Sequence, residues 1–106
     1  MSKCKLTNPI VRAAMEALGN GDRAAWYALF EPHAEVFDAS SPWNLEEFTN
    51  HAVGYERLLS IAHVKNDGLD VVGEIYSELW GCSRTYFYFR ISPAGRIARL
   101  EVGQAI

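Results

Sequence analysis

The chain has 106 residues, of which 49% are hydrophobic and 22% are charged, as expected for one soluble globular domain spanning residues 1–106. Its net charge of −3 argues against nucleic acid as a partner, and no apolar run approaches the ~20 residues that span a membrane. The N-terminus lacks the apolar core of a signal peptide, and Cys4 and Cys82 stand in no metal-binding spacing. We therefore expect a cytoplasmic protein whose cysteines are reduced.

The first third of the chain predicts two helices. Residues 1–7 are expected to be a frayed tail, and Asn8-Pro9 is a helix start, because Asn caps free N–H groups and Pro is tolerated at the first helical position. Gly19-Asn20-Gly21 ends this helix, since Gly and Asn accept the left-handed conformation of a C-cap. Asp22 is placed to cap the second helix. Pro32 is expected to end it, with His33 in the following loop, because Pro has no N–H.

Residues 34–38 alternate as a strand does and end in a carboxylate. Ala34, Val36 and Asp38 share one face, and the residues between them share the other. If the first face is the apolar interior, desolvation raises the pKa of Asp38 and makes it a better general base near neutral pH. The alternative is that Asp38 only starts the loop that contains Ser40.

The rest of the chain predicts one more helical region and then strands. Asn44 followed by Glu47 indicates a capping box for a short helix. Gly54 should break that helix, and residues 55–62 are expected to form a second helical segment. The Asn66-Asp67-Gly68 sequence is typical of a type I′ hairpin turn. Three long strands are then predicted, over residues 69–80, 82–91 and 96–105.

The order of these motifs resembles a known superfamily. EALGNGDRAAWYALFEPHAEVFD, residues 16–38, is similar to the opening of nuclear transport factor 2-like proteins, above all the SnoaL-like cyclases and the ketosteroid isomerases. GYERLL, residues 54–59, resembles the start of the family's third helix. Residues 87–89 and 95–97 resemble its late Phe-x-Phe strand, turn and final strand. The resemblance covers residues 8–105 and implies an α+β fold, in which a cone-shaped, curved antiparallel sheet wraps around the N-terminal helices.

The resemblance also implies a site. In the ketosteroid isomerases an Asp at the end of the first strand moves a proton beside a carbonyl, so Asp38 is the candidate catalytic residue, acting on an apolar small molecule. Phe-x-Phe should point into the cone, which makes Asp38 the one ionisable group of an apolar pocket. The expected pocket-lining residues are Trp26, Phe30, Val36, Thr85, Phe87 and Phe89. No cofactor and no metal are expected, because His, Asp and Glu fall in no metal-ligand arrangement.

Two departures from the isomerase pattern leave two functions open. The acidic donors that would hold an enolate oxygen are replaced by Ala14 and Thr85. Steroid isomerase activity itself is therefore not expected. His51 and His63 could act together as catalytic bases, as in dehydratase members of the superfamily. No spacing supports this, and we expect surface or hydrogen-bonded roles for both. The first hypothesis is an isomerase, cyclase or hydrolase that uses Asp38. The second is a non-catalytic ligand-binding or dimerisation module of the same fold.

A partner surface is predicted on the other side of the Phe-x-Phe strand. Arg84, Tyr86, Tyr88 and Arg90 alternate with the inward residues, so they share the outward face. Aromatic and Arg side chains on an outward sheet face are typical of an interface. We therefore expect a homodimer formed through the outer face of the sheet.

Overall fold

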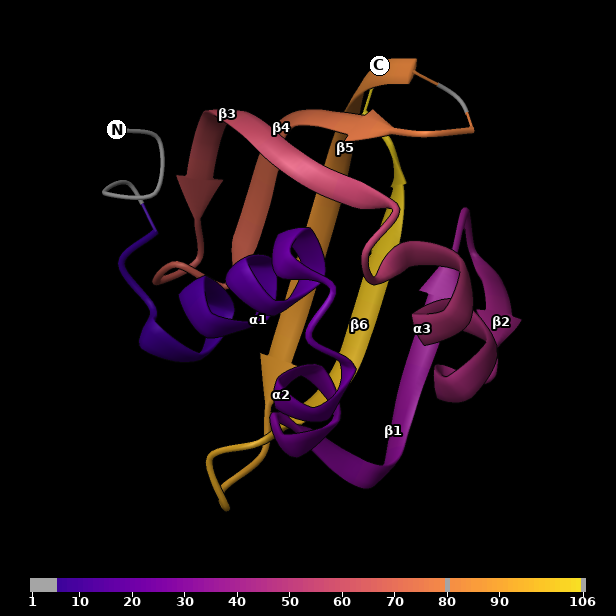
Figure 1. The fold of residues 1–106 in the computed structure, drawn as a ribbon. Helices are drawn as coiled ribbons and strands as arrows, with labels where there is room; N and C mark the ends of the chain where they lie inside the picture. The colour runs from indigo at the N-terminus through magenta and orange to yellow at the C-terminus, as the bar shows by residue number, and fades with distance from the viewer. Residues whose placement is uncertain (1–5, 80, 106) are drawn as a thin grey trace.

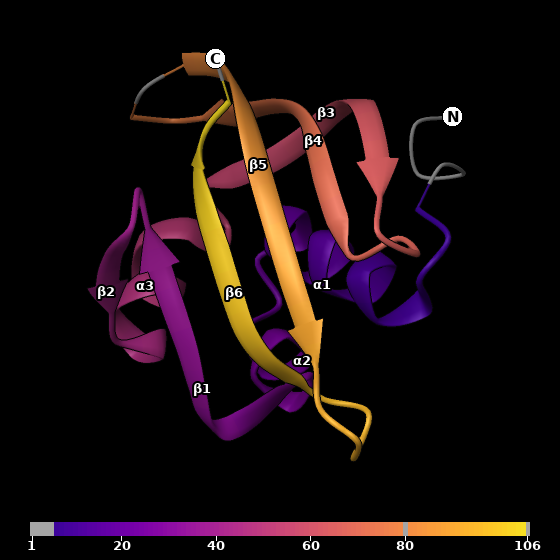
Figure 2. The same ribbon diagram turned by 180° about the vertical axis from the view of Figure 1, so that it is seen from behind.

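The protein is described by a computed structural model over residues 6–79 and 81–105, which form a curved six-stranded sheet with helices against one face (Figure 1). The helices are α1 (Pro9–Asn20), α2 (Arg23–Ala28) and α3 (Leu45–Ala52). The strands are β1 (Phe30–Asp38), β2 (Ser41–Trp43), β3 (Glu56–Lys65), β4 (Asp70–Ser77), β5 (Gly81–Ile91) and β6 (Ile97–Gln104). The strand order is β2-β1-β6-β5-β4-β3. The β1–β6 pair is parallel and the other pairs are antiparallel. Seen from behind, the opposite face of the sheet carries no helix (Figure 2). The predicted α+β class and the curved sheet are confirmed, but the sheet is mixed and not wholly antiparallel as predicted, because β1 and β6 run parallel.

The three predicted helix N-caps are confirmed. The side chains of Asn8, Asp22 and Asn44 accept hydrogen bonds from first-turn N–H groups of α1, α2 and α3, and these bonds satisfy donors that the helices leave free. Gly21 ends α1 in the left-handed conformation with φ 70°. The hairpin between β3 and β4 turns at Asp67 and Gly68, whose φ angles of 57° and 87° suit a type I′ turn.

The second helix is shorter than predicted. It ends at Ala28, and Pro32 and His33 lie in β1 rather than beyond a helix that Pro32 stops. Leu29 caps the helix, and its carbonyl already accepts a hydrogen bond from the Ile97 N–H at 2.7 Å, so the chain joins β6 before it reaches the proline. The pairing of β1 with β6 is irregular between Phe30 and Glu35. Pro32 is tolerated there because a residue without an N–H fits an irregular stretch of strand.

The helix predicted over residues 55–62 is wrong, because this segment is the edge strand β3. Two irregularities in its pairing with β4 shift the alternation of side chains. Leu58, Ile61 and Val64 therefore face the core at spacings of three, which imitates a helical pattern. Gly73 of β4 allows the close approach, since a Cβ at that position would lie 2.3 Å from the carbonyl oxygen of Ser60. The similarity of residues 54–59 to a third helix is thus not realised.

The core fills the space between the helices and the inner face of the sheet. Trp26, Phe89 and Leu100 are fully buried in it. Leu6 is also fully buried, and the Arg12 guanidinium donates to its carbonyl at 2.8 Å, so the predicted frayed tail is wrong at this residue. Residues 1–5, which include Cys4, lie outside the described residues, as does Trp80, the last residue of the strand predicted over residues 69–80.

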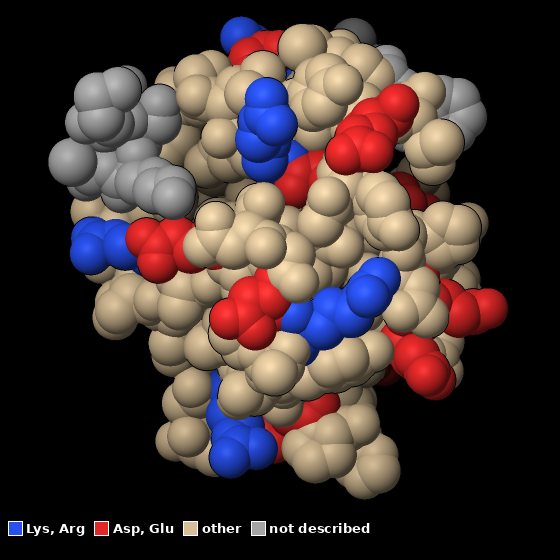
Figure 3. Space-filling view, viewed as in Figure 1, with Lys and Arg blue, Asp and Glu red and all other residues tan. Residues whose placement is uncertain are grey.

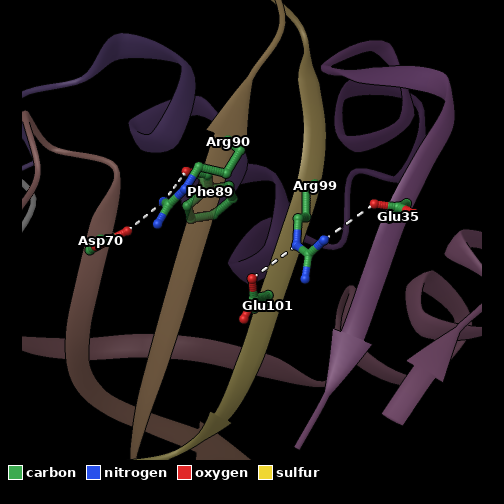
Figure 4. A network of polar contacts seen from close by, with 6 residues as sticks. All are labelled: Glu35, Asp70, Phe89, Arg90, Arg99 and Glu101. Atoms are coloured by element: carbon green, nitrogen blue, oxygen red, sulfur yellow. Dashed lines mark hydrogen bonds and ion pairs between the residues drawn. The ribbon is translucent and has the colours of Figure 1, made fainter. Parts of the chain in front are cut away.

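Charged side chains are spread over the outside of the molecule. Acidic and basic groups are interspersed on the face shown in Figure 3, without a continuous area of positive charge. On the outer face of the sheet they form ion pairs, Arg90–Asp70 at 2.7 Å and Arg99–Glu101 at 2.9 Å, and Arg99 also reaches Glu35 (Figure 4). Among the described residues, no helix has both the length and the apolar character needed to span a membrane.

Candidate active site

A cavity of about 490 Å³ opens at one end of the strands, where β1, β4 and β6 end and β3 and β5 begin. The inner face of the sheet forms most of its wall, and α3 contributes one aromatic side chain. A volume of this size is in the range of small-molecule sites. The lining residues are Asp38, Phe48, Glu56, Ile75, Ser77, Cys82, Ser83, Thr85, Phe87, Val102, Gly103 and Gln104.

Asp38 lies in this cavity because of strand parity. It is the last residue of β1 and pairs with Val102 of β6. Val36, two residues earlier on the same face, is 1% exposed, whereas Glu35 points to the outer face and meets Arg99. The Asp38 carboxyl is half-buried, and the loss of water around it raises its pKa above the ordinary value.

Glu56 is a second carboxyl in the same cavity, and the sequence did not identify it. It is the first residue of β3 and pairs with Ser77. Burial, and then the negative charge of Asp38, raise the pKa of Glu56 to about 7. Because this segment was predicted to be a helix, Glu56 was not assigned to the inner face of a strand. The strand signal that could have found it is the alternation of Glu56 and Leu58, which lasts only until the first irregularity of β3.

The cavity has an apolar side and a polar side. Phe48, Phe87 and their aliphatic neighbours form the first, and hydroxyl groups form much of the second. The hydroxyls of Ser83 and Thr85 lie 3.3 Å apart and are hydrogen-bonded. No Lys, Arg or His is found among the described lining residues, so the two carboxyls have no neutralising side chain within the cavity. The prediction of Asp38 as the one ionisable group of the pocket is therefore wrong, since Glu56 also lines the wall.

The structure divides the predicted pocket-lining residues. Thr85 and Phe87 line the cavity with Asp38. Trp26, Val36 and Phe89 are buried in the core below it, because the cavity occupies the strand ends and does not extend down the sheet. Phe30 begins β1, at the end opposite Asp38, and borders a second cleft between α2, β1 and α3.

The remaining candidates lie apart from the cavity. His51 and His63 are exposed, and His51 packs edge-on against Trp43 with 5.1 Å between ring centroids. Ala14 is fully buried and does not line the cavity, so that position offers no donor to a ligand there. No three His, Cys, Asp or Glu residues in the described part of the chain are arranged to hold a metal ion.

Comparison with solved structures places this architecture. A nuclear transport factor 2-like protein of unknown function from Cytophaga hutchinsonii superposes with a TM-score of 0.76 at 14% identity, and the match covers 93% of this chain and 89% of that one. The chain has the nuclear transport factor 2-like fold. A candidate polyketide cyclase from Sinorhizobium meliloti gives a TM-score of 0.72 at 22% identity, covering 96% and 99% of the two chains. A protein with a cystatin-like fold from Silicibacter pomeroyi gives 0.70 at 17% identity, covering 96% and 77%.

These similarities confirm the fold that the sequence motifs predicted. No protein-family model matches the sequence, and no curated protein matches it. At identities this low the nuclear transport factor 2-like fold is shared, and an activity does not follow from the fold. The chemistry therefore has to be inferred from the cavity of this chain.

Proposed function

We propose that this protein is a small-molecule enzyme that transfers a proton, with the Asp38 carboxylate as its general base. The observation that carries this proposal is the position of Asp38, half-buried in a cavity of ligand size and without a basic side chain among the described lining residues. A structural Asp at a strand end is usually exposed or paired, because burying an unpaired carboxylate costs free energy. Perturbed carboxyls in a cavity are frequent at catalytic sites.

The reaction that fits a single base is the removal of a proton from a carbon next to a carbonyl group. The C–H bond breaks, Asp38 takes the proton, and the electron pair of the bond forms an enolate. If the proton on Asp38 is first replaced by one from solvent, reprotonation of the same carbon gives exchange, and delivery of the proton to another carbon of the enolate gives isomerisation. The same base could start a cyclisation, in which the enolate carbon attacks a second carbonyl. The raised pKa of Asp38 favours proton removal near neutral pH.

The walls of the cavity indicate the kind of molecule that it accepts. Phe48 and Phe87 offer apolar surface to a ring or chain, and the hydroxyl groups opposite can hydrogen-bond to oxygen atoms. A compact carbonyl compound with an apolar part fits this description.

The test is hydrogen exchange on a model ketone. 2-Tetralone combines a flat apolar ring with acidic C–H groups beside a carbonyl. Incubated with protein in deuterated buffer, it should gain deuterium at these carbons, as followed by NMR. Asp38→Asn keeps the shape but removes the base, so the catalysed rate should fall by about 100-fold or more. Asp67→Asn, at an exposed turn position that also suits Asn, is the matched control and should exchange as the wild type does.

A non-catalytic ligand-binding module is the second candidate. The buried Ala14 supports it, because no acidic donor stands at that position. In this case wild type and Asp38→Asn would bind 2-tetralone with equal affinity, and neither would accelerate exchange above the buffer rate. That result would contradict the proposed enzyme.

We also propose that two copies associate through the outer face of the sheet, which is the homodimer expected from the sequence. The rings of Tyr86 and Tyr88 stack with centroids 4.6 Å apart, and Tyr86 covers Gly103 of the neighbouring strand. Together they make an aromatic area on β5, with Arg84 and Arg90 next along the same side of the strand. Figure 2 shows that no helix covers this face of the sheet.

Light scattering at micromolar concentration tests this assembly. The wild type should have the mass of a dimer. Tyr88→Glu should give monomers, because a buried unpaired charge opposes association. Ala94→Glu adds the same charge at an exposed turn and should remain dimeric. A wild type that stays monomeric at high concentration would contradict the proposal.

A further inference from the structure

Glu56 and Asp38 enter the cavity from distant parts of the sheet. Asp38 ends β1, Glu56 begins β3, and three strands, β6, β5 and β4, lie between them in the sheet. Because both carboxyls line the same cavity, a molecule that fills it contacts both. After burial, the negative charge of Asp38 is the second cause of the raised pKa of Glu56, so the two carboxyls influence each other across the cavity.

The surroundings of Glu56 offer it no counter-charge in the described part of the chain. Among the residues that line the cavity, the other titratable ones are Asp38 of β1 and Cys82 of β5, and Cys82 is exposed. Arg57 lies nearby, but its guanidinium is placed over the ring of Tyr76, and it forms no ion pair with Glu56. The titratable groups around a small hollow that Glu56 also borders are Tyr55, Arg57, Tyr76 and Glu78.

We propose that Glu56 is the acid of this site, whose protonated carboxyl donates a hydrogen bond to the carbonyl oxygen of the substrate while Asp38 removes the proton from carbon. This proposal rests on the proposed function, since it concerns the same reaction. It also accounts for the missing donors, because neither Ala14 nor the hydroxyl of Thr85 supplies an acidic group. The acidic group comes instead from β3, a strand whose apolar residues have a helical spacing in the sequence.

The proton balance of the pair is consistent with these roles. Burial, and then the charge of Asp38, raise the pKa of Glu56 to about 7, so Glu56 can carry a proton up to neutral pH, whereas the pKa of Asp38 is raised by burial alone. A carboxylic acid that stays neutral in apolar surroundings can donate to an oxygen that gains negative charge. When the C–H bond breaks, the charge develops on the substrate oxygen, next to the Glu56 O–H, and the proton moves to Asp38.

This arrangement selects the charge of the substrate. The cavity holds two carboxyls, and its described lining contains no basic residue. An anionic substrate is repelled, whereas a neutral carbonyl compound accepts the hydrogen bond from Glu56. The inferred substrate class is therefore a neutral ketone, aldehyde or ester, and not a carboxylate or a phosphate.

Binding of two probes of similar shape tests the donor and the charge selection. At about pH 6, 2-naphthol is neutral and carries an oxygen like that of an enol, and 2-naphthoate carries a carboxylate on the same ring. Wild type should bind 2-naphthol at least about tenfold more tightly than 2-naphthoate. Glu56→Leu should weaken 2-naphthol binding by about tenfold, and Glu56→Gln, which keeps an amide donor, by less. Glu78→Gln, at an exposed position, should bind as the wild type does. Equal binding of 2-naphthol by wild type and Glu56→Leu would overturn the proposal.

NMR titration of the Glu56 carboxyl is a second measurement, and it needs no ligand. The midpoint should lie near 7 in the wild type and fall in Asp38→Asn, which removes the neighbouring charge. A wild-type midpoint near the ordinary value of 4.5 would mean that Glu56 is ionised at neutral pH and cannot donate, which overturns the proposal.

The exchange assay separates a failure of this inference from a failure of the proposed function. Glu56→Leu should lower the exchange rate of 2-tetralone by about 100-fold, as the loss of an oxyanion donor does, and Glu56→Gln should recover part of it. If Asp38→Asn abolishes exchange but folded Glu56→Leu retains the full rate, Asp38 remains the general base and the role proposed for Glu56 is wrong. If the wild type does not accelerate exchange of 2-tetralone, the proposed function is wrong. The titration of Glu56 and the affinities for 2-naphthol still decide whether Glu56 is a hydrogen-bond donor.

Discussion

The two faces of the sheet treat their carboxylates in opposite ways. On the outer face Asp70, Glu74 and Glu101 each lie within 3.2 Å of an arginine, and their side chains keep 22%, 37% and 36% of their surface exposed. At the inner edge Asp38 and Glu56 are drawn partly out of water and form no ion pair with any described residue. Arginines therefore neutralise the carboxylates of the outer face, where water would also stabilise the charge. Asp38 and Glu56 have no such partner, although burial of their charges costs free energy.

This difference indicates where stability has been given up for a site. Exposed ion pairs contribute little to stability, so the outer pairs are a solubility and surface feature. A buried carboxyl with a raised pKa destabilises the folded chain at neutral pH, because the unfolded chain ionises it more easily. An unfavourable pair that lines a ligand-sized cavity is better explained by chemistry than by folding.

The largest expected effect compares two phenylalanines on opposite faces. Phe89 is fully buried on the inner face, so Phe89→Ala should lower the free energy of unfolding by about 3–5 kcal/mol. Phe37 is half-buried on the outer face under the guanidinium of Arg99, so Phe37→Ala should cost about 1 kcal/mol. Urea denaturation measures both. Equal losses would mean that the outer face is as tightly packed as the core.

The carboxyl pair should reveal itself in the pH dependence of stability. The pKa of Glu56 is about 7 in the folded protein against 4.5 for the free group. Between these values the unfolded chain has lost the proton that the folded chain keeps, so stability falls as pH rises through this window. Glu56→Gln removes the penalty and should raise the free energy of unfolding by about 3 kcal/mol at pH 8, with almost no gain at pH 4.

The control for that experiment is Glu78→Gln, which removes an exposed carboxyl close to Glu56. Its effect should stay within about 0.5 kcal/mol at both pH values. A Glu56→Gln variant that is no more stable than wild type at pH 8 would show that the cavity does not perturb Glu56.

A smaller effect is expected where an aromatic ring covers a glycine on the outer face. A Cβ on Gly103 would lie about 2.5 Å from the Tyr86 side chain, so Gly103→Ala must displace that ring. The expected loss is about 1 kcal/mol, together with a changed NMR signature of the stacked Tyr86 and Tyr88 rings. In a Tyr86→Ala background the same substitution should cost almost nothing. An equal cost in both backgrounds would place the strain in the backbone.

The smallest effect should come from an outer ion pair. Arg84 and Glu74 lie 3.2 Å apart and are both open to solvent. Arg84→Gln should change the free energy of unfolding by about 0.5 kcal/mol or less, and added salt should remove the difference. A loss that is larger and insensitive to salt would contradict the contrast between the two faces.

The sequence by itself determined the local features of this protein. Asn8, Asp22 and Asn44 cap their helices as predicted, because a cap needs only a short polar side chain next to free N–H groups. The alternation around Asp38 and Phe87 correctly assigned their faces, since successive side chains of a regular strand point to opposite sides. The ordered motifs also predicted the nuclear transport factor 2-like fold, but not that residues 56–65 form a strand or that β1 and β6 run parallel.

Only the tertiary structure decided the elements whose form depends on distant partners. β3 has a helical spacing of apolar residues, but β4 provides a free edge and Gly73 provides the room, so the segment pairs as an irregular strand. That pairing carries Glu56 to the cavity, beside an Asp that is 18 positions away in the sequence. β1 likewise begins before Pro32, because the Ile97 N–H of β6 donates a hydrogen bond to the Leu29 carbonyl and Phe30 already pairs with β6. Local periodicity cannot report such choices, since the hydrogen bonds and burial that settle them come from residues elsewhere in the chain.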